Sequence, residues 1–331
     1  MTTPSTPLVS ILTPVYNGEQ FLEECIESVI NQTYKNFVYT IVNNKSADRS
    51  LDIALSYAKR DARVTVVSND RFAEVIENHN IAFRLTSPNA RYCKIVSADD
   101  AIFPDCLERM VATAEANPSA GVIGCYQLSG TRVRWQGYPF PKTLINGRDL
   151  GRQMLMMRDA LFGFGSPTSL LYRADLVRRT STFFPNHSPH ADTSACYECM
   201  KDSDFAFVYQ VLCLERLSGN TQSSRAARIR EDLPASVSDV INYGRYFLAP
   251  DEYERKTKEL LQLYYEALAT QVVAGKGRSF LAYHKRRLGE LGVPMKPSAL
   301  IKAGMTKFIR EISNPGHLIA KARRSFARPS P

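Results

Sequence analysis

The chain of 331 residues has no uninterrupted apolar run near the ~18 residues that a membrane span needs. Its opening stretch, MTTPSTPLVS, lacks the basic and long apolar segments of a secretory signal. The seven cysteines are odd in number and scattered, which does not indicate a disulfide framework. We therefore expect a cytoplasmic, reducing environment for this protein.

Glycine and tryptophan are also scarce. The one short glycine pattern, Gly163 to Ser166, is not followed by the lysine of a phosphate-binding loop. Tryptophan occurs once, at Trp135. Hydrophobic residues nevertheless make up 44% of the chain, which is enough apolar material for a substantial core and excludes a wholly disordered protein.

The net positive charge arises at one end of the chain. The net charge is +9, and residues 251–331 hold 16 basic and 7 acidic side chains, whereas residues 1–250 hold 26 of each. A nucleic-acid enzyme usually carries its positive field on its active domain, so nucleic acid is not an expected partner. The basic end is expected to be an appendage that contacts something anionic.

Short β-rich runs alternate with amphipathic segments. Strands are predicted over 8–15, 37–42, 64–67, 92–96, 122–128, 169–172 and 205–214, and helices over 19–31, 49–60, 73–86, 104–116, 174–179 and 191–200. This alternation predicts an α/β fold whose parallel sheet is covered on both faces. Ligands of such sheets bind at the carboxyl ends of the strands, which singles out the loops 13–18, 43–48 and 97–104.

Asp99 and Asp100 follow a predicted buried strand. Two adjacent carboxylates there are costly unless a cation or hydrogen-bond donors satisfy them. A hard cation such as Mg²⁺ or Mn²⁺, shared with a diphosphate, is a natural partner. A solvated turn or a helix N-cap before Pro104 is the alternative that the pair alone leaves open.

Four short segments follow one another along the first third of the chain. They are SILTPVYN at 10–17, SVINQT at 28–33, IVNNKSAD at 41–48, and ADD at 98–100 followed by Pro104. Together they resemble the motifs of family 2 glycosyltransferases, which are inverting enzymes with the GT-A fold. The resemblance is specific over residues 7–128 and looser to about residue 230. It implies a nucleotide-sugar donor, expected to be UDP-linked, and a divalent metal.

The resemblance also implies roles for single residues. Those expected to bind the nucleotide sugar are Thr13, Pro14, Tyr16, Asn43, Arg71, Asn78 and Asp99. Asp100 is expected to hold the Mg²⁺ or Mn²⁺ ion. Asn43 stands where the family usually has an aspartate for the base edge, and Ser97 stands at the first acidic position of the fuller motif. For Arg71 a solvated surface charge is an equally good interpretation.

An inverting transfer needs one base, which takes the proton of the attacking hydroxyl. In the family the base opens a helix before a strand and a later arginine, which points to Asp192, with Arg216 as that arginine. The later pair Asp202 and Asp204 is the alternative, and a polar turn is the plainer interpretation of that pair.

Two further features suggest binding surfaces. Trp135, Tyr138 and Phe140 are candidates for an aromatic platform under a sugar ring, with core packing as the alternative. Ile301, Met305, Phe308 and Ile312 repeat at helical spacing among lysines and arginines. Residues 297–328 are therefore expected either to lie on an anionic membrane or to pack on the catalytic domain.

These observations predict a GT-A glycosyltransferase domain over residues 1–235 and a basic helical extension over residues 236–331. The nucleotide-binding half would cover about 7–128 and the acceptor half about 129–235. The expected acceptor is a glycan or lipid-linked saccharide in surface polysaccharide synthesis. The other hypothesis, kept open by Asn43 and Ser97, is a non-catalytic nucleotide-sugar-binding protein. In either case the expected location is the cytoplasm or the inner face of the cytoplasmic membrane.

Overall fold

A computed structural model describes residues 6–157, 163–186, 188, 190–217 and 228–312. The chain divides into two compact units, residues 1–225 and residues 226–331. The boundary predicted from the sequence lies ten residues later, after residue 235. Each unit is described by itself.

The first unit is built on a sheet with the strand order β3-β2-β1-β4-β9-β6-β10-β5, with β7 beside β6 and β8 beside β10. The strands are β1 (Val9–Val15), β2 (Phe37–Asn43), β3 (Val64–Ser68), β4 (Tyr92–Ile95), β5 (Ala101–Ile102), β6 (Ala120–Ser129), β7 (Arg132–Arg134), β8 (Leu144–Ile145), β9 (Leu170–Arg173) and β10 (Asp204–Glu215). All seven predicted strands are present with ends shifted by a few residues.

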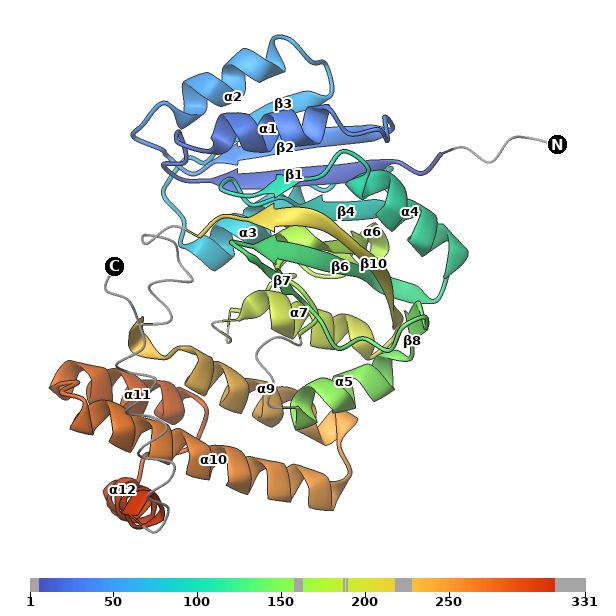
Figure 1. Cartoon of the computed structure of the whole chain (residues 1–331). Coiled ribbons are helices and arrows are strands. Elements are labelled where there is room, and N and C mark those ends of the chain that lie inside the picture. Colours follow the sequence, from blue (N-terminus) through green and yellow to red (C-terminus); the bar gives the residue numbers. More distant parts are fainter. Residues whose placement is uncertain (1–5, 158–162, 187, 189, 218–227, 313–331) are drawn as a thin grey trace. The chain divides into compact units, whose positions relative to one another are not determined.

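The helices of the first unit cover both faces of this sheet (Figure 1). They are α1 (Leu22–Ile30), α2 (Ser50–Ala58), α3 (Val75–Arg84), α4 (Cys106–Ala116), α5 (Gly147–Met156), α6 (Ala174–Arg178) and α7 (Ala191–Met200). Apolar residues of α1, α2 and α4 share one buried cluster with alternate residues of the central strands. Helices α3 and α6 contact each other and strands of the sheet, and α7 contacts β6 and β10.

The sheet is mostly parallel, with one informative exception. Strands β1, β2, β3 and β4 run parallel to one another, and β6 runs parallel to β10. Strand β9 lies between β4 and β6 and is antiparallel to both. Because β4 and β6 are both antiparallel to β9, they point in the same direction. The carboxyl ends of β4 and β6 therefore lie at the same edge of the sheet as those of β1 and β2. The predicted α/β architecture is confirmed.

The second unit consists of helices: α9 (Asp232–Phe247), α10 (Pro250–Val273), α11 (Arg278–Glu290) and α12 (Pro297–Ile312). Its core is formed by five buried side chains, Val237, Tyr264, Leu268, Phe280 and Leu288. None of the described helices is both long and apolar enough to cross a membrane.

Candidate active site

The loops after β1 and β2 are braced against each other at the carboxyl edge of the sheet. The amide of Asn17 donates to Ser46 Oγ at 3.0 Å, and the amide of Ala47 donates back to Asn17 Oδ1 at 2.8 Å. Asn17 has a φ of +50°, a left-handed conformation that asparagine tolerates better than most residues. The first two predicted loops therefore form one rigid rim.

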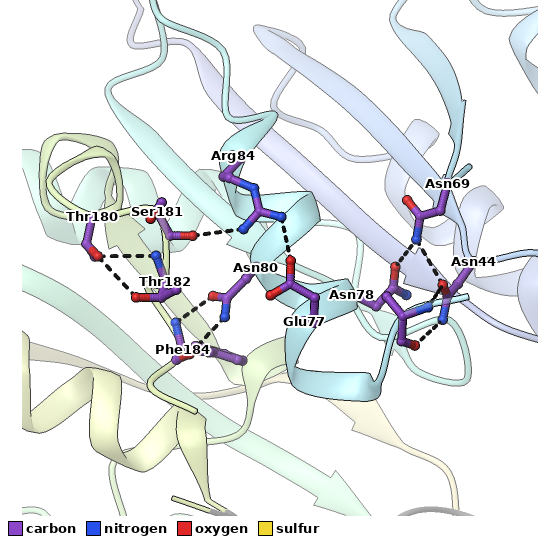
Figure 2. Close-up of polar contacts among 11 residues, drawn as sticks. Asn44, Asn69, Glu77, Asn78, Asn80, Arg84, Thr180, Ser181, Thr182 and Phe184 are labelled. Carbon is purple, nitrogen blue, oxygen red and sulfur yellow. Dashed lines mark hydrogen bonds and ion pairs between the residues drawn. The ribbon is translucent and has the colours of Figure 1, made fainter. Parts of the chain in front are cut away.

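Asparagine side chains fix the neighbouring loop that leads into α3 (Figure 2). The Asn44 amide both donates to the Ala73 carbonyl at 2.8 Å and accepts from the Ala73 amide at 2.9 Å. Asn69 Nδ2 donates to Asn44 Oδ1 at 2.9 Å and to Asn78 Oδ1 at 3.0 Å. Asn78 is buried and accepts this hydrogen bond beside the loop that leads into α3.

The other residues expected to bind the nucleotide lie along the same edge. Asn43, at the end of β2, donates to Ser68 Oγ at 3.3 Å and accepts from the Ser46 amide at 3.2 Å. Tyr16 is half exposed and meets the ring of Phe72 edge-to-face, with centroids 4.9 Å apart. Arg71 is exposed on the loop before α3.

Thr13 and Pro14 lie within β1 and below this edge. Both are buried, and the Thr13 hydroxyl donates to the Val96 carbonyl at 2.8 Å and accepts from Tyr39 at 2.9 Å. The Thr13 side chain therefore ties β1 to the chain just before the Asp-Asp pair. The Thr13 hydroxyl already donates its hydrogen to Val96, so it has none left to donate to a ligand. Thr13 therefore contributes to the site by fixing the backbone around it.

Asp100 is buried, with 7% of its surface exposed, and two hydrogen bonds define the position of its carboxylate. Thr168 Oγ1 donates to Asp100 Oδ2 at 2.5 Å, and the Arg216 amide donates to Asp100 Oδ1 at 3.4 Å. Burial raises the pKa of Asp100 to about 7, and the carboxylates of Asp99 and Glu215 add to the rise against these two hydrogen bonds. A divalent cation at this position would relieve both the burial cost and the repulsion.

Asp99 is half-buried beside Asp100. Burial raises its pKa and Glu215 adds to the rise, while its own backbone amide, Arg216 and His79 oppose it. Within the described part of the chain, no three side chains of the kinds that bind metals gather closely enough to hold an ion by themselves. A cation held by Asp100 would therefore need oxygen ligands from a bound diphosphate, which is how Mg²⁺ is commonly bound.

Thr168 is held in turn by the buried side chain of Lys94. It lies in the short turn η1 (Pro167–Ser169), and its hydroxyl also accepts from the Ser97 amide at 3.1 Å. Lys94, on β4, is fully buried and donates from Nζ to the carbonyls of Thr168 at 2.6 Å and Leu170 at 3.2 Å. The ammonium group thereby fixes the turn that fixes the Asp100 carboxylate.

Asp192 lies in the first turn of α7, half-buried, and accepts from the neighbouring Thr193 amide at 2.8 Å. Burial lowers the pKa of the nearby His79, on α3, and the Val75 carbonyl and the carboxylates of Asp192 and Asp99 oppose that change.

The segment that precedes α7 is docked on α3 through a fully buried amide (Figure 2). Asn80 Nδ2 donates to the Phe184 carbonyl, and the Phe184 amide donates to Asn80 Oδ1, both at 2.9 Å. Arg84 adds a bond to the Ser181 carbonyl at 2.9 Å. Helix α3 therefore contacts the nucleotide edge through Asn78 and supports the approach to Asp192 through Asn80.

The alternative base candidates lie elsewhere. Asp204 begins β10 and accepts from Ser119 Oγ at 2.7 Å and from the Gly147 amide at 3.0 Å. Glu215 ends the same strand of 12 residues, so Asp204 lies about 35 Å from the carboxyl edge at ~3.3 Å per residue. Asp202 is exposed and pairs with Arg179 at 3.1 Å. This placement supports Asp192.

Arg216, expected to be the later arginine of the family, flanks the site. Its guanidinium pairs with Glu24 and lies 4.9 Å from the centroid of the Phe21 ring. Glu215 and Thr168 are residues that the sequence analysis misses. Glu215 could have been found, because it ends a predicted strand of the same sheet, whereas the position of Thr168 depends on the pairing of β9.

The fold and this arrangement of carboxylates are those of a nucleotide-diphospho-sugar glycosyltransferase. Glycosyl transferase family 2 matches residues 10–180, more than half of the chain, and the chain belongs to that family. The predicted family and GT-A fold are confirmed.

The chain is similar to named members of the family over part of its length. It is 38% identical over 130 residues to the uncharacterized glycosyltransferase EpsJ of Bacillus subtilis, which covers 38% of this chain and 36% of EpsJ. It is 29% identical over 171 residues to a PGL/p-HBAD biosynthesis glycosyltransferase of Mycobacterium bovis, covering 51% and 66% of the two chains. The match to EpsJ thus spans little more than a third of that relative.

Solved structures support the fold over more of the chain. Residues 1–349 of Staphylococcus aureus TarS in complex with UDP-GlcNAc superpose with a TM-score of 0.62 at 16% identity, covering 86% of this chain and 81% of that TarS fragment. The mannosyltransferase PcManGT of Pyrobaculum calidifontis, in complex with GDP-Man and Mn²⁺, gives 0.55 at 16% identity, covering 92% and 88%.

Proposed function

We propose that the protein is an inverting glycosyltransferase that moves a sugar from a nucleotide donor, UDP-linked, to a hydroxyl of a glycan or lipid-linked saccharide. The observation that carries this proposal is the buried Asp100 carboxylate at the carboxyl edge of a family 2 sheet. Burial and the neighbouring carboxylates raise the pKa of Asp100, so a bound cation would be stabilised there. An acceptor in surface polysaccharide synthesis is the finer part of the proposal and derives from the family resemblance.

The nucleotide would lie along the ends of β1 and β2. Tyr16 offers an exposed ring for the base, and Asn43 offers an amide that can both donate to and accept from a base edge. Asp99 is proposed for the ribose, with Asn78 and Arg71 beside the nucleotide. TarS was solved with UDP-GlcNAc and PcManGT with GDP-Man, which supports a nucleotide-sugar ligand without choosing its base.

Asp100 would hold the Mg²⁺ or Mn²⁺ ion, whose role is to neutralise the charge that grows on the leaving diphosphate. The presence of Mn²⁺ with PcManGT supports this choice of cation. Thr168 and the Arg216 amide orient the carboxylate, and Lys94 holds Thr168 in place.

Asp192 would act as the base. The acceptor hydroxyl attacks the anomeric carbon in line with the departing diphosphate, and Asp192 takes its proton as the new bond forms. The half-buried carboxylate in the first turn of α7 supports this role.

A screen of nucleotide sugars by thermal melting tests the proposal, because a ligand that binds the native state raises the melting temperature by mass action. We expect one or a few donors to stabilise the protein, and Mn²⁺ to increase the effect. Asp100→Asn should remove the part that depends on Mn²⁺, whereas Asp202→Asn, on the exposed residue that pairs with Arg179, should not. A donor that binds without any release of its diphosphate, in every acceptor mixture tried, would favour the non-catalytic binding protein.

The second unit is proposed to rest on an anionic membrane surface. Helix α12 packs on α10 through Ala303 and Gly304, the latter close to Ala269. Its opposite face presents Ile301, Met305 and Ile309, which are 64%, 60% and 61% exposed. Apolar side chains at i, i+4 and i+8 beside a net positive charge suit the interface of an anionic bilayer. Of the predicted stripe, the side chains of Phe308 and Ile312 lie outside the described residues, as do residues 313–331.

A further inference from the structure

Trp135 follows β7 at the carboxyl end of β6, where Gln127 pairs with Arg134. It has a φ of +66°, a left-handed conformation that is an outlier for a bulky aromatic residue. Such a conformation costs about 1–3 kcal/mol and persists only where the surroundings impose it. Tyr138 and Phe140 do not extend the Trp135 surface: Tyr138 is buried and stacked against Phe205 and Phe207, and Phe140 is 76% exposed and lies against Tyr209.

Three neighbours hold the indole of Trp135. Its Nε1–H donates to Gln127 Oε1 at 2.7 Å, and the Arg134 guanidinium lies 4.8 Å from the ring centroid. Gly163 lies so close that a Cβ atom there would be 2.7 Å from the ring carbon Cζ3. The side chain is half-buried, so part of the ring remains open to solvent.

Two hydrogen-bond donors beside this ring are unpaired. Gln127 is fully buried, and its Oε1 accepts from both the indole and Ser166 Oγ. Because an indole N–H can only donate, the amide orientation is fixed. Gln127 Nε2 and Arg134 Nε then have no hydrogen-bond partner in any part of the chain that the structure describes. A buried donor left unpaired costs about 1–3 kcal/mol, which a ligand oxygen would recover.

The cluster borders the active site. Ser166 donates to Gln127 Oε1 at 2.8 Å, and Thr168, two residues on, donates to Asp100. Two residues of chain span at most about 7 Å, so the cluster and the Asp100 carboxylate flank one turn. The nucleotide residues belong to β1 and β2, whereas the cluster belongs to β6 and β7, on the other side of β4 in the sheet.

We propose that Trp135, Gln127 and Arg134 form the subsite for the acceptor saccharide. A pyranose ring has an apolar C–H face that suits an indole and hydroxyl oxygens that suit two unpaired donors. In-line attack requires the acceptor to approach from the side opposite the diphosphate, and this cluster lies opposite the nucleotide strands. The inference rests on the proposed function and names the substrate position within it.

The single tryptophan of the chain makes the subsite directly observable. Emission of the full-length protein loaded with UDP and Mn²⁺ should change saturably with at least one of the methyl glycosides of glucose, galactose, N-acetylglucosamine and glucuronic acid. UDP and Mn²⁺ alone should leave the emission nearly unchanged. Gln127→Met, which keeps the volume but removes the donor, should weaken the glycoside response about tenfold. Gln136→Met, on an exposed glutamine next to Trp135, is the matched control.

Two results would overturn the acceptor subsite. One is an emission change with UDP-GlcNAc but with no methyl glycoside, which would assign the cluster to the donor sugar. The other is a tryptophan that responds to no saccharide, or a Gln127→Met variant that responds as the wild type does. Nucleotide binding measured by calorimetry on the same samples separates these results from a failure of the proposed function, since Gln127→Met should leave nucleotide affinity unchanged.

Discussion

Asp192 is the residue whose chemistry can be separated from binding. Asp192→Asn keeps the size of the side chain but removes the proton acceptor, so turnover should fall by ~10² or more, the usual contribution of a positioned base. Donor affinity should barely change, because Asp192 is not assigned to the nucleotide. Steady-state kinetics with calorimetric donor binding would show this as a loss of kcat.

The matched control is Asp202→Asn, at an exposed carboxylate that pairs with Arg179. It should keep wild-type turnover. If Asp202→Asn is inactive while Asp192→Asn is active, the base belongs to the later acidic pair and the assignment of Asp192 is wrong.

Thr168 is a positioning residue for the metal site, because its hydroxyl fixes the Asp100 carboxylate at 2.5 Å. Thr168→Val keeps the shape and removes the hydroxyl, so Mn²⁺ affinity in the presence of a nucleoside diphosphate should weaken about 10–100-fold. Thr168→Ser should restore most of it. Equal Mn²⁺ affinity in the valine variant and the wild type would show that Thr168 does not position Asp100.

At the scale of elements, the sequence predicts more of the sheet than of the site. The strands are apolar runs bounded by turn residues, so their positions follow from local pattern, and the rule of carboxyl ends brings together the loops that carry Asn43 and Asp100. The insertion of β9 between β4 and β6 is a non-local pairing that no local pattern encodes. For this reason the position of Thr168 beside Asp100 could not be predicted.

Helix α12 carries the prediction at this scale. Serine at all three exposed positions, Ile301, Met305 and Ile309, should abolish co-sedimentation with phosphatidylglycerol vesicles, because apolar burial and charge attraction act together. Wild-type binding should weaken as salt rises, since screening reduces the attraction of each basic side chain. Donor binding should be unaffected.

The control variant is Leu55→Ser, which removes an exposed apolar side chain from α2, outside α12. That variant should bind vesicles like the wild type. If the full-length wild-type protein does not co-sediment with these vesicles at low salt, the membrane proposal is contradicted.

For the molecule as a whole, His284 predicts how stability depends on pH. It is fully buried, with Nε2 donating to the Ile229 carbonyl at 3.0 Å and Nδ1 accepting from Tyr264 at 2.7 Å. Burial lowers the pKa of His284 from 6.5 to about 4, with Arg230 acting in the same direction and Asp232 and the Ile229 carbonyl opposing. The unfolded chain therefore binds this proton at a higher pH than the folded chain does.

The consequence has a definite sign. The stability that His284 contributes is complete above pH 6.5 and is lost as the pH falls toward 4, by an amount on the order of 3 kcal/mol. Calorimetric melting of the full chain should show the melting temperature falling over this range. His284→Gln should flatten that part of the profile, and an unchanged profile in the variant would assign the acid sensitivity to other groups.

The central claim, metal-assisted transfer from a nucleotide sugar held at Asp100, is tested most directly by release of nucleoside diphosphate. UDP-sugars and GDP-sugars are incubated with the full-length protein and Mn²⁺, with and without a mixture of saccharide acceptors. We expect release from at least one donor, faster with acceptor, removed by a chelator and reduced at least ~10²-fold in Asp100→Asn. Undiminished release in Asp100→Asn, or no release from any donor by the wild-type protein, would contradict the account.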